Sequence, residues 1–159
     1  MESVLALVDF SGVTEAVVKN AADMAQAFRA QLILLHVSMP DADYEGSKLR
    51  TNFSRDGVAG EMQSYHHTLL RMEKQWRDVG IDVKALLVRS TSIRGNPVRK
   101  ILQEIGRLKP DLIVVGSHGY GLIHDMLLGG VSSTVVRKAP CPILVVPIRK
   151  RRQPRKQRS

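Results

Sequence analysis

The sequence predicts an α/β fold in which a five-stranded parallel-type sheet carries helices on both faces. Short apolar runs alternate along the chain with segments of helical spacing, the pattern of strands joined by crossover helices. Each run is apolar throughout, as expected when both faces of a parallel sheet are buried. The 159 residues fit a single domain. If the chain winds one way through strands one to three and then returns, the strand order is 3-2-1-4-5.

The first strand is expected at residues 3–9 and the second at 31–37, with a helix between them. Ser11 or Thr14 is available as the N-cap of this helix. A polar stretch follows the second strand to about Gly57 and predicts the longest loop. The helix has one apolar stripe at a spacing of 4, 3 and 4 residues, formed by Val17, Ala21, Met24 and Phe28.

The second helix has the clearest apolar stripe, and Gly80 is expected to end it. Strand three is expected at residues 82–89, and Asn96 and Pro97 then form an N-cap and first-turn pair for a third helix. The second-helix stripe consists of Met62, Tyr65, Leu69, Met72, Trp76 and Val79. The third-helix stripe consists of Val98, Ile101, Leu102, Ile105 and Leu108. Strand four (111–116), a short helix (131–138) and strand five (143–147) complete the pattern.

The positive charge of the chain is concentrated in its last eleven residues. Residues 149–159 contain seven basic residues and no acid, so only +2 of the formal charge of +9 falls on residues 1–148. We therefore expect one folded domain at residues 1–148 and a basic disordered tail at residues 149–159. The tail is interpreted either as a solvated extension or as a sequence-independent binder of nucleic acid or anionic surfaces.

Other bulk features predict a soluble cytoplasmic protein. No apolar run approaches the roughly 18 residues of a membrane-spanning helix, and the first residues lack the basic start of a secretory signal. The single cysteine, Cys141, excludes an internal disulfide and lacks partners for a structural zinc site. We interpret Cys141 as a small hydrophobic residue leading into the last strand.

The candidate ligand site is a glycine-rich segment between strand four and the short helix. Glycines allow backbone N–H groups to approach an anion closely, and the helix that begins at Val131 adds unpaired N–H donors. A flexible connection with turn glycines is the alternative. The segment holds five of the twelve glycines, Gly116, Gly119, Gly121, Gly129 and Gly130. In such sheets ligands bind beyond the carboxyl ends of the strands, which here carry VDFS and GSHG.

The spacing of these glycines resembles that of the universal stress protein family. ATP-binding members carry Gly, two residues, Gly, nine residues, Gly and then Ser or Thr. Here Gly116 and Gly119 are followed by YGLIHDMLL and Gly129. The segments VDFS, LHV, DLIVVGSHG and RKAPCPILVVP also resemble the family in its usual order. The resemblance covers nearly the whole chain except the tail.

The resemblance implies a Rossmann-like fold of the adenine nucleotide alpha hydrolase-like type that binds ATP, ADP or AMP, with Mg²⁺ accompanying the phosphates. It places Leu7, Val8 and Asp9 on the adenine and ribose side and the backbone of Val37 against the base. Val115 and Gly116 then support the ribose, and the phosphates are held by Gly119, Gly129, Gly130 and Val131. Gly130 stands where the family has Ser or Thr. Asp9 has a second interpretation as a cap of the turn after strand one.

Three functions are weighed. The first is a stress or signalling protein whose nucleotide-bound state is read by a partner, and for which the resemblance implies a homodimer through residues 143–147. The second is a slow ATPase or phosphotransferase, which the absence of a phosphate-loop lysine disfavours. The third is nucleic-acid binding by the tail. His118 has no identifiable partner and His36, His66, His67 and His124 lack ligand spacing, so we predict no catalytic residue and no dedicated metal site.

Overall fold

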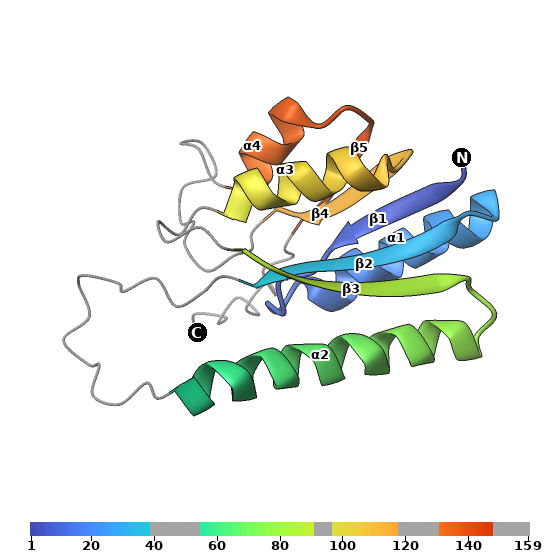
Figure 1. The fold of residues 1–159 in the computed structure, drawn as a ribbon. Helices are drawn as coiled ribbons and strands as arrows, with labels where there is room; N and C mark the ends of the chain where they lie inside the picture. Colours follow the sequence, from blue (N-terminus) through green and yellow to red (C-terminus); the bar gives the residue numbers. More distant parts are fainter. Residues whose placement is uncertain (39–54, 91–96, 118–130, 148–159) are drawn as a thin grey trace, which may run out of the picture.

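Strands and helices alternate strictly in the computed structural model, which describes residues 1–38, 55–90, 97–117 and 131–147 (Figure 1). The strands are β1 (Ser3–Leu7), β2 (Gln31–Ser38), β3 (Val83–Arg89), β4 (Leu112–Gly116) and β5 (Ile143–Val146). The helices are α1 (Thr14–Phe28), α2 (Arg55–Asp78), α3 (Pro97–Leu108) and α4 (Val131–Lys138).

The strands form one parallel sheet in the order β3-β2-β1-β4-β5. The central strand β1 joins the two halves of the sheet, since Val4 lies opposite Leu32 of β2 on one side and Leu112 of β4 on the other. The predicted sheet and its order are therefore confirmed. All the carboxyl ends point to one edge, on the left of Figure 1.

Helices cover both faces of the sheet, with α1 and α2 on one side and α3 and α4 on the other (Figure 1). Alternate residues of each strand supply the two cores, as the two-residue period of a strand requires. Val4 and Ala6 of β1 pack against α1, whereas Leu5 and Leu7 pack toward α3. This double burial explains why β1 is apolar from Val4 to Leu7.

The start of α1 differs from the prediction. Thr14 is the first residue of the helix rather than its cap, and the N-cap position is Val13, which makes no side-chain cap hydrogen bond. The hydroxyls of Ser11 and Thr14 donate to Asp9 Oδ1, at 2.7 and 3.0 Å, and Ser11 Oγ accepts a hydrogen bond from Val13 N–H at 3.4 Å. Both hydroxyl groups therefore belong to the turn before the helix, which Asp9 organises.

The ends of the two long helices are capped in the same way. Gly80, at φ 88°, closes α2 as predicted, with Ile81 N–H donating to the Trp76 carbonyl and Gly80 N–H to that of Arg77, the Schellman pattern. Two residues that the sequence placed on apolar stripes are not buried. Phe28 is 53% exposed and Val79 is 63% exposed. Phe28 is the last residue of α1 and Val79 follows the end of α2, so both lie where the helices leave the sheet.

Several boundaries shift by a few residues. β1 ends at Leu7 rather than at residue 9, and α2 begins at Arg55, inside the stretch expected to be a loop. Pro97 is the first residue of α3 as predicted. Its expected cap, Asn96, lies outside the described residues.

Gly106→Ala is expected to stabilise the protein. Gly106 lies in the interior of α3 and is exposed, and a Cβ added there would meet nothing within 4 Å. Alanine in a helix interior is favoured over glycine by about 0.5–1 kcal/mol, which corresponds to a rise in melting temperature of about 1–4 °C for a chain of this size. Thermal unfolding followed by circular dichroism measures the change. A lower melting temperature would show an undetected constraint at this position.

Candidate functional site

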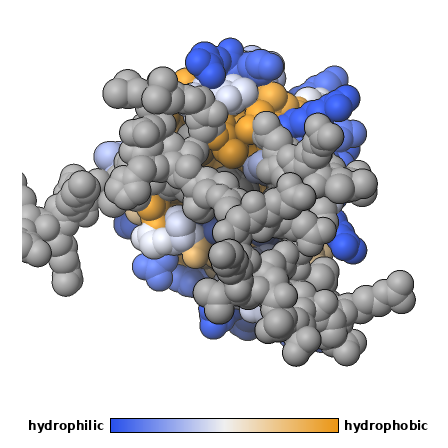
Figure 2. All heavy atoms as spheres, turned by 90° about the vertical axis from the view of Figure 1, so that its left-hand side faces the viewer, coloured by the Kyte–Doolittle hydropathy of each residue, from blue (hydrophilic) through white to orange (hydrophobic). Residues whose placement is uncertain are grey.

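The carboxyl ends of β1 and β4 lie side by side at the centre of the sheet. Ala6 is opposite Val114, so the same register brings Val8 to the level of Gly116. This is the point where the strand order reverses, because the chain winds outward to β2 on one side of β1 and to β4 on the other. Crevices at such points are the usual ligand sites of parallel sheets. Figure 2 views the molecule from this edge and shows apolar surface in the upper half of the face, with hydrophilic side chains at its margins.

Four of the predicted site residues have buried side chains. Leu7, Val8, Val37 and Val115 are each at most 4% exposed, and their side chains belong to the two cores. The N–H of Val8 is also used within the sheet, because it donates to the Leu35 carbonyl at 2.8 Å. These residues therefore build the edge of the sheet at which the candidate site lies.

Val131 is the first residue of α4 and packs against the core on the α3 side. The helix therefore starts where the sequence predicted. Gly119, Gly129 and Gly130, together with His118, His124 and the basic tail, lie outside the described residues.

Asp9 organises the turn that follows β1. Its Oδ1 accepts hydrogen bonds from Ser11 N–H at 3.0 Å, from Ser11 Oγ at 2.7 Å and from Thr14 Oγ1 at 3.0 Å. This is the turn-capping role that the sequence offered as one of two interpretations of Asp9. The two roles are compatible, because a carboxylate has two oxygens and about four acceptor sites.

A cluster of three rings lies beside this turn and was missed by sequence reasoning. Phe10 follows Asp9, His36 lies in β2 and Tyr65 in α2, and the ring centroids are 4.6 to 5.1 Å apart. Phe10 has a left-handed φ of 57°, which is unusual for a bulky residue. The available signal was a histidine inside an otherwise apolar buried strand.

An open groove of about 480 Å³ runs between the start of α1 and strand β5. Its lining residues are Gly12, Val13, Ala16, Asn20, Leu144, Val145, Val146 and Pro147. The predicted nucleotide-site residues that the structure describes are not among them. The groove lies along the sheet edge that β5 forms.

Cys141 packs against the core between α3 and α4, in keeping with its interpretation as a small hydrophobic residue. Burial raises the pKa of its thiol, and the Asp111 carboxylate raises it further. Asp111 itself accepts hydrogen bonds from the N–H groups of Glu2 and Ser3 at 2.6 and 3.1 Å, which lower the pKa of its carboxyl group. A thiol with a raised pKa is a poor nucleophile at neutral pH.

Neither a membrane-spanning helix nor a metal-binding cluster occurs among the described residues. Helices long and apolar enough to cross a membrane are absent from 1–38, 55–90, 97–117 and 131–147. The same ranges hold no group of three or more His, Cys, Asp or Glu residues placed to bind a metal ion.

Comparisons with known proteins agree with this geometry. Residues 1–147 match the model of the universal stress protein family. A universal stress protein of Thermus aquaticus is 32% identical over 126 residues, covering 77% of this chain and 81% of the relative. Universal stress protein MJ0577 of Methanocaldococcus jannaschii is 30% identical over 154 residues, covering 87% and 90%.

Solved structures show the same fold. The structure described for hypothetical protein MJ0577 superposes with a TM-score of 0.73 at 26% identity, covering 94% of this chain and 97% of that one. A universal stress protein in complex with cAMP superposes with a TM-score of 0.66 at 23% identity, covering 92% and 96%. The strand order, the matched length and the shared sequence all point the same way: the chain belongs to the universal stress protein family.

Proposed function

We propose that this chain binds an adenine nucleotide, ATP or its products ADP and AMP, at the carboxyl edge of the sheet. The observation that carries the proposal is the pairing of β1 with β4 at the reversal of strand order. This pairing aligns the segment that ends in Asp9 with Gly116, at the start of the glycine-rich segment. Parallel sheets bind nucleotides at this place because backbone groups and helix N-termini face the crevice there.

The relatives support this choice of ligand. Solved universal stress proteins with the same fold are described in complex with cAMP, dAMP and AMP. These three ligands share an adenine base, a sugar and a phosphate group, and the glycine-rich segment from 116 to 130 is our candidate for binding phosphate. A role in stress response or signalling, with a partner that reads the bound state, is proposed from the family alone.

The proposed site residues fall into groups according to the part of the nucleotide that each group contacts. Leu7 and Val8 lie on the adenine and ribose side, Val37 contacts the base through its backbone, and Asp9 offers carboxylate acceptors for ribose hydroxyls. Val115 and Gly116 support the sugar, while Gly119, Gly129, Gly130 and the start of α4 at Val131 hold the phosphates, which Mg²⁺ accompanies. Gly130 lacks the hydroxyl found in ATP-binding relatives, so phosphate contacts at that position use the backbone N–H alone.

We expect the protein to bind ATP tightly but to hydrolyse it slowly. Efficient phosphoryl transfer requires cationic groups on the developing charge and a group that orients the nucleophile, and residues 116–130 contain no Lys or Arg. Backbone N–H groups bind ground state and transition state about equally, which does not accelerate the reaction. The measurement is a single-turnover assay with labelled ATP and excess protein. Hydrolysis faster than about 1 per second, a rate typical of enzymes, would replace this proposal with the ATPase alternative.

We also propose that the chain forms a homodimer through β5. The carbonyls of Pro142 and Val146 accept hydrogen bonds from Ile113 and Ser117, on the β4 side, so the polar groups of Ile143 and Val145 face outward. Among the described residues, none forms a hydrogen bond with the outward N–H and C=O groups of Ile143 and Val145. Val145 is 37% exposed and lines the groove beside α1. An unpaired apolar edge of this kind favours pairing with a second copy.

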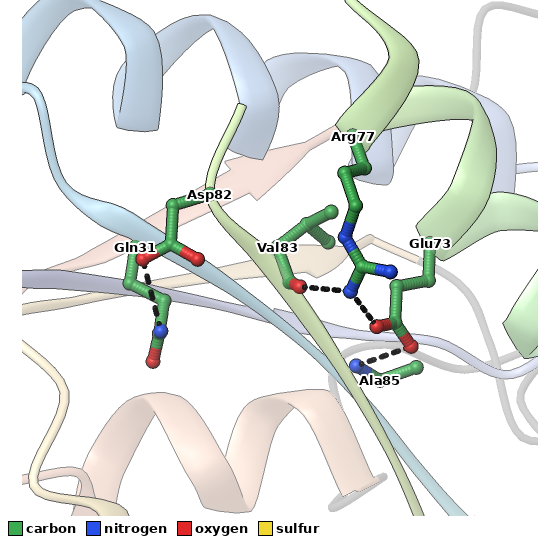
Figure 3. A network of polar contacts seen from close by, with 6 residues as sticks. All are labelled: Gln31, Glu73, Arg77, Asp82, Val83 and Ala85. Carbon is green, nitrogen blue, oxygen red and sulfur yellow. Dashed lines mark hydrogen bonds and ion pairs between the residues drawn. The ribbon is translucent and has the colours of Figure 1, made fainter. Parts of the chain in front are cut away.

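The opposite edge, β3, is already engaged by side chains of α2 (Figure 3). Ala85 N–H donates to Glu73 Oε2 at 3.2 Å, and Arg77 donates to the Val83 carbonyl at 3.3 Å. Glu73 and Arg77 are also paired with each other. This arrangement competes with strand addition at β3, and it supports β5 as the edge that associates.

A further inference from the structure

The side chain of His36 forms a hydrogen bond with the backbone of Val8, the residue immediately before Asp9. It is only 6% exposed, and its Nδ1 lies 2.7 Å from the carbonyl oxygen of Val8. A carbonyl oxygen can only accept a hydrogen bond, so Nδ1 carries the proton and donates it. The N–H of Val8 donates to the Leu35 carbonyl at 2.8 Å. Strand β2 therefore binds both backbone polar groups of Val8.

The residue after Asp9 is fixed from the same side. The Phe10 ring lies 4.6 Å from the imidazole of His36 and stacks on Tyr65 at 5.1 Å with an angle of 4° between the rings. His36 and Tyr65 are themselves 4.7 Å apart. The left-handed φ of Phe10 costs conformational energy, and the ring contacts offset it. His36 thus holds the chain on both sides of Asp9.

We propose that His36 is a positioning residue for the nucleotide site, because it fixes the backbone from Val8 to Phe10 in the conformation that presents Asp9 to the ligand. The proposal rests on the proposed adenine-nucleotide function. His36 exerts this effect through the hydrogen bond from Nδ1 to the Val8 carbonyl, while its ring contact with Phe10 adds to the packing of the turn.

Two substitutions separate the hydrogen bond from the ring. In His36→Asn the side-chain amide can place an N–H near the position of Nδ1, whereas His36→Leu has no donor. Both variants lose the imidazole ring, so their difference reports the bond to Val8. Ile105→Val serves as the control for loss of stability, because Ile105 is fully buried on the opposite face of the sheet. The ATP dissociation constant, by calorimetry, and the melting temperature are measured for all four proteins.

The expected result is a dissociation constant that rises about tenfold or more in His36→Leu and stays within about threefold of the unsubstituted protein in His36→Asn. If His36→Leu only melts earlier, as Ile105→Val does, and binds ATP normally, His36 is structural and the proposal is overturned. Equal loss of binding in both His36 variants would also overturn it. Absence of binding by the unsubstituted protein would instead refute the nucleotide function on which the proposal rests.

A measurement on the unsubstituted protein covers the case in which His36→Leu does not fold. In ¹⁵N-labelled protein, His36 is expected to show a protonated Nδ1 whose resonance shifts when ATP saturates the site. An unprotonated Nδ1, or a resonance unchanged at saturation, would overturn the proposal.

Discussion

ATP at about 100 times its dissociation constant is expected to raise the melting temperature of this protein by about 5–10 °C, and Gly129→Val is expected to abolish the rise. A ligand at that excess adds about 2.7 kcal/mol to the free energy of unfolding, and for a domain of this size each kcal/mol is worth about 2–4 °C. Valine at position 129 puts a branched side chain where we expect backbone N–H groups to meet the phosphates. Thermal unfolding with and without ATP measures both effects.

Gly106→Ala is the matched control for this experiment. It also replaces a glycine by a larger residue, but in the exposed interior of α3, so it should show the full ATP-dependent rise above its own baseline. A Gly129→Val protein that is stabilised by ATP as strongly as the control would show that the glycine-rich segment does not hold the phosphates.

Val145→Pro is expected to convert the proposed dimer to a monomer at micromolar concentrations. Proline removes the outward N–H of Val145 and leaves the ladder with β4 intact, since edge strands tolerate proline on their free side. By two-fold symmetry the change occurs twice per dimer. Two acceptors left unsatisfied cost about 2–6 kcal/mol, equivalent to an increase of about thirtyfold or more in the dissociation constant of the dimer. Sedimentation velocity over a concentration series measures it.

Val145→Thr is the control for the shape of the side chain, because threonine is similar in size to valine and keeps the backbone N–H. It should remain dimeric. A Val145→Pro protein that dimerises as tightly as Val145→Thr would place the interface elsewhere, and a monomeric unsubstituted chain would remove the proposal altogether.

The sheet was predictable because burial on both faces leaves a strong record in the sequence. Strand β4 is apolar at every position and β1 at every position after Ser3, and glycine and proline mark the ends of the helices, as Gly80 and Pro97 show. The start of α1 was not predictable in the same way. Which residue takes the N-cap position depends on the backbone conformation of the turn after Asp9, which residue spacing does not specify.

The place of the candidate site residues in the fold could be predicted in part. Val8 and Gly116 lie side by side at the carboxyl edge because of the strand order, which the sequence reasoning anticipated. The ring cluster of Phe10, His36 and Tyr65 did not follow, because it joins three elements that are far apart in the chain. Tyr65 was assigned to an apolar stripe, which is correct for its position on α2 but does not reveal its partners.

Binding of adenine nucleotides at the carboxyl edge of the sheet is tested most directly by the amide chemical shifts of ¹⁵N-labelled protein titrated with ATP. We expect saturable shifts concentrated at Val8, Asp9, Val37 and Gly116, with little change at Ala30 and Ile81, which lie at the amino edge. Shifts confined to the amino edge or to the groove beside β5, or no shifts with ATP, ADP, AMP or cAMP, would contradict it.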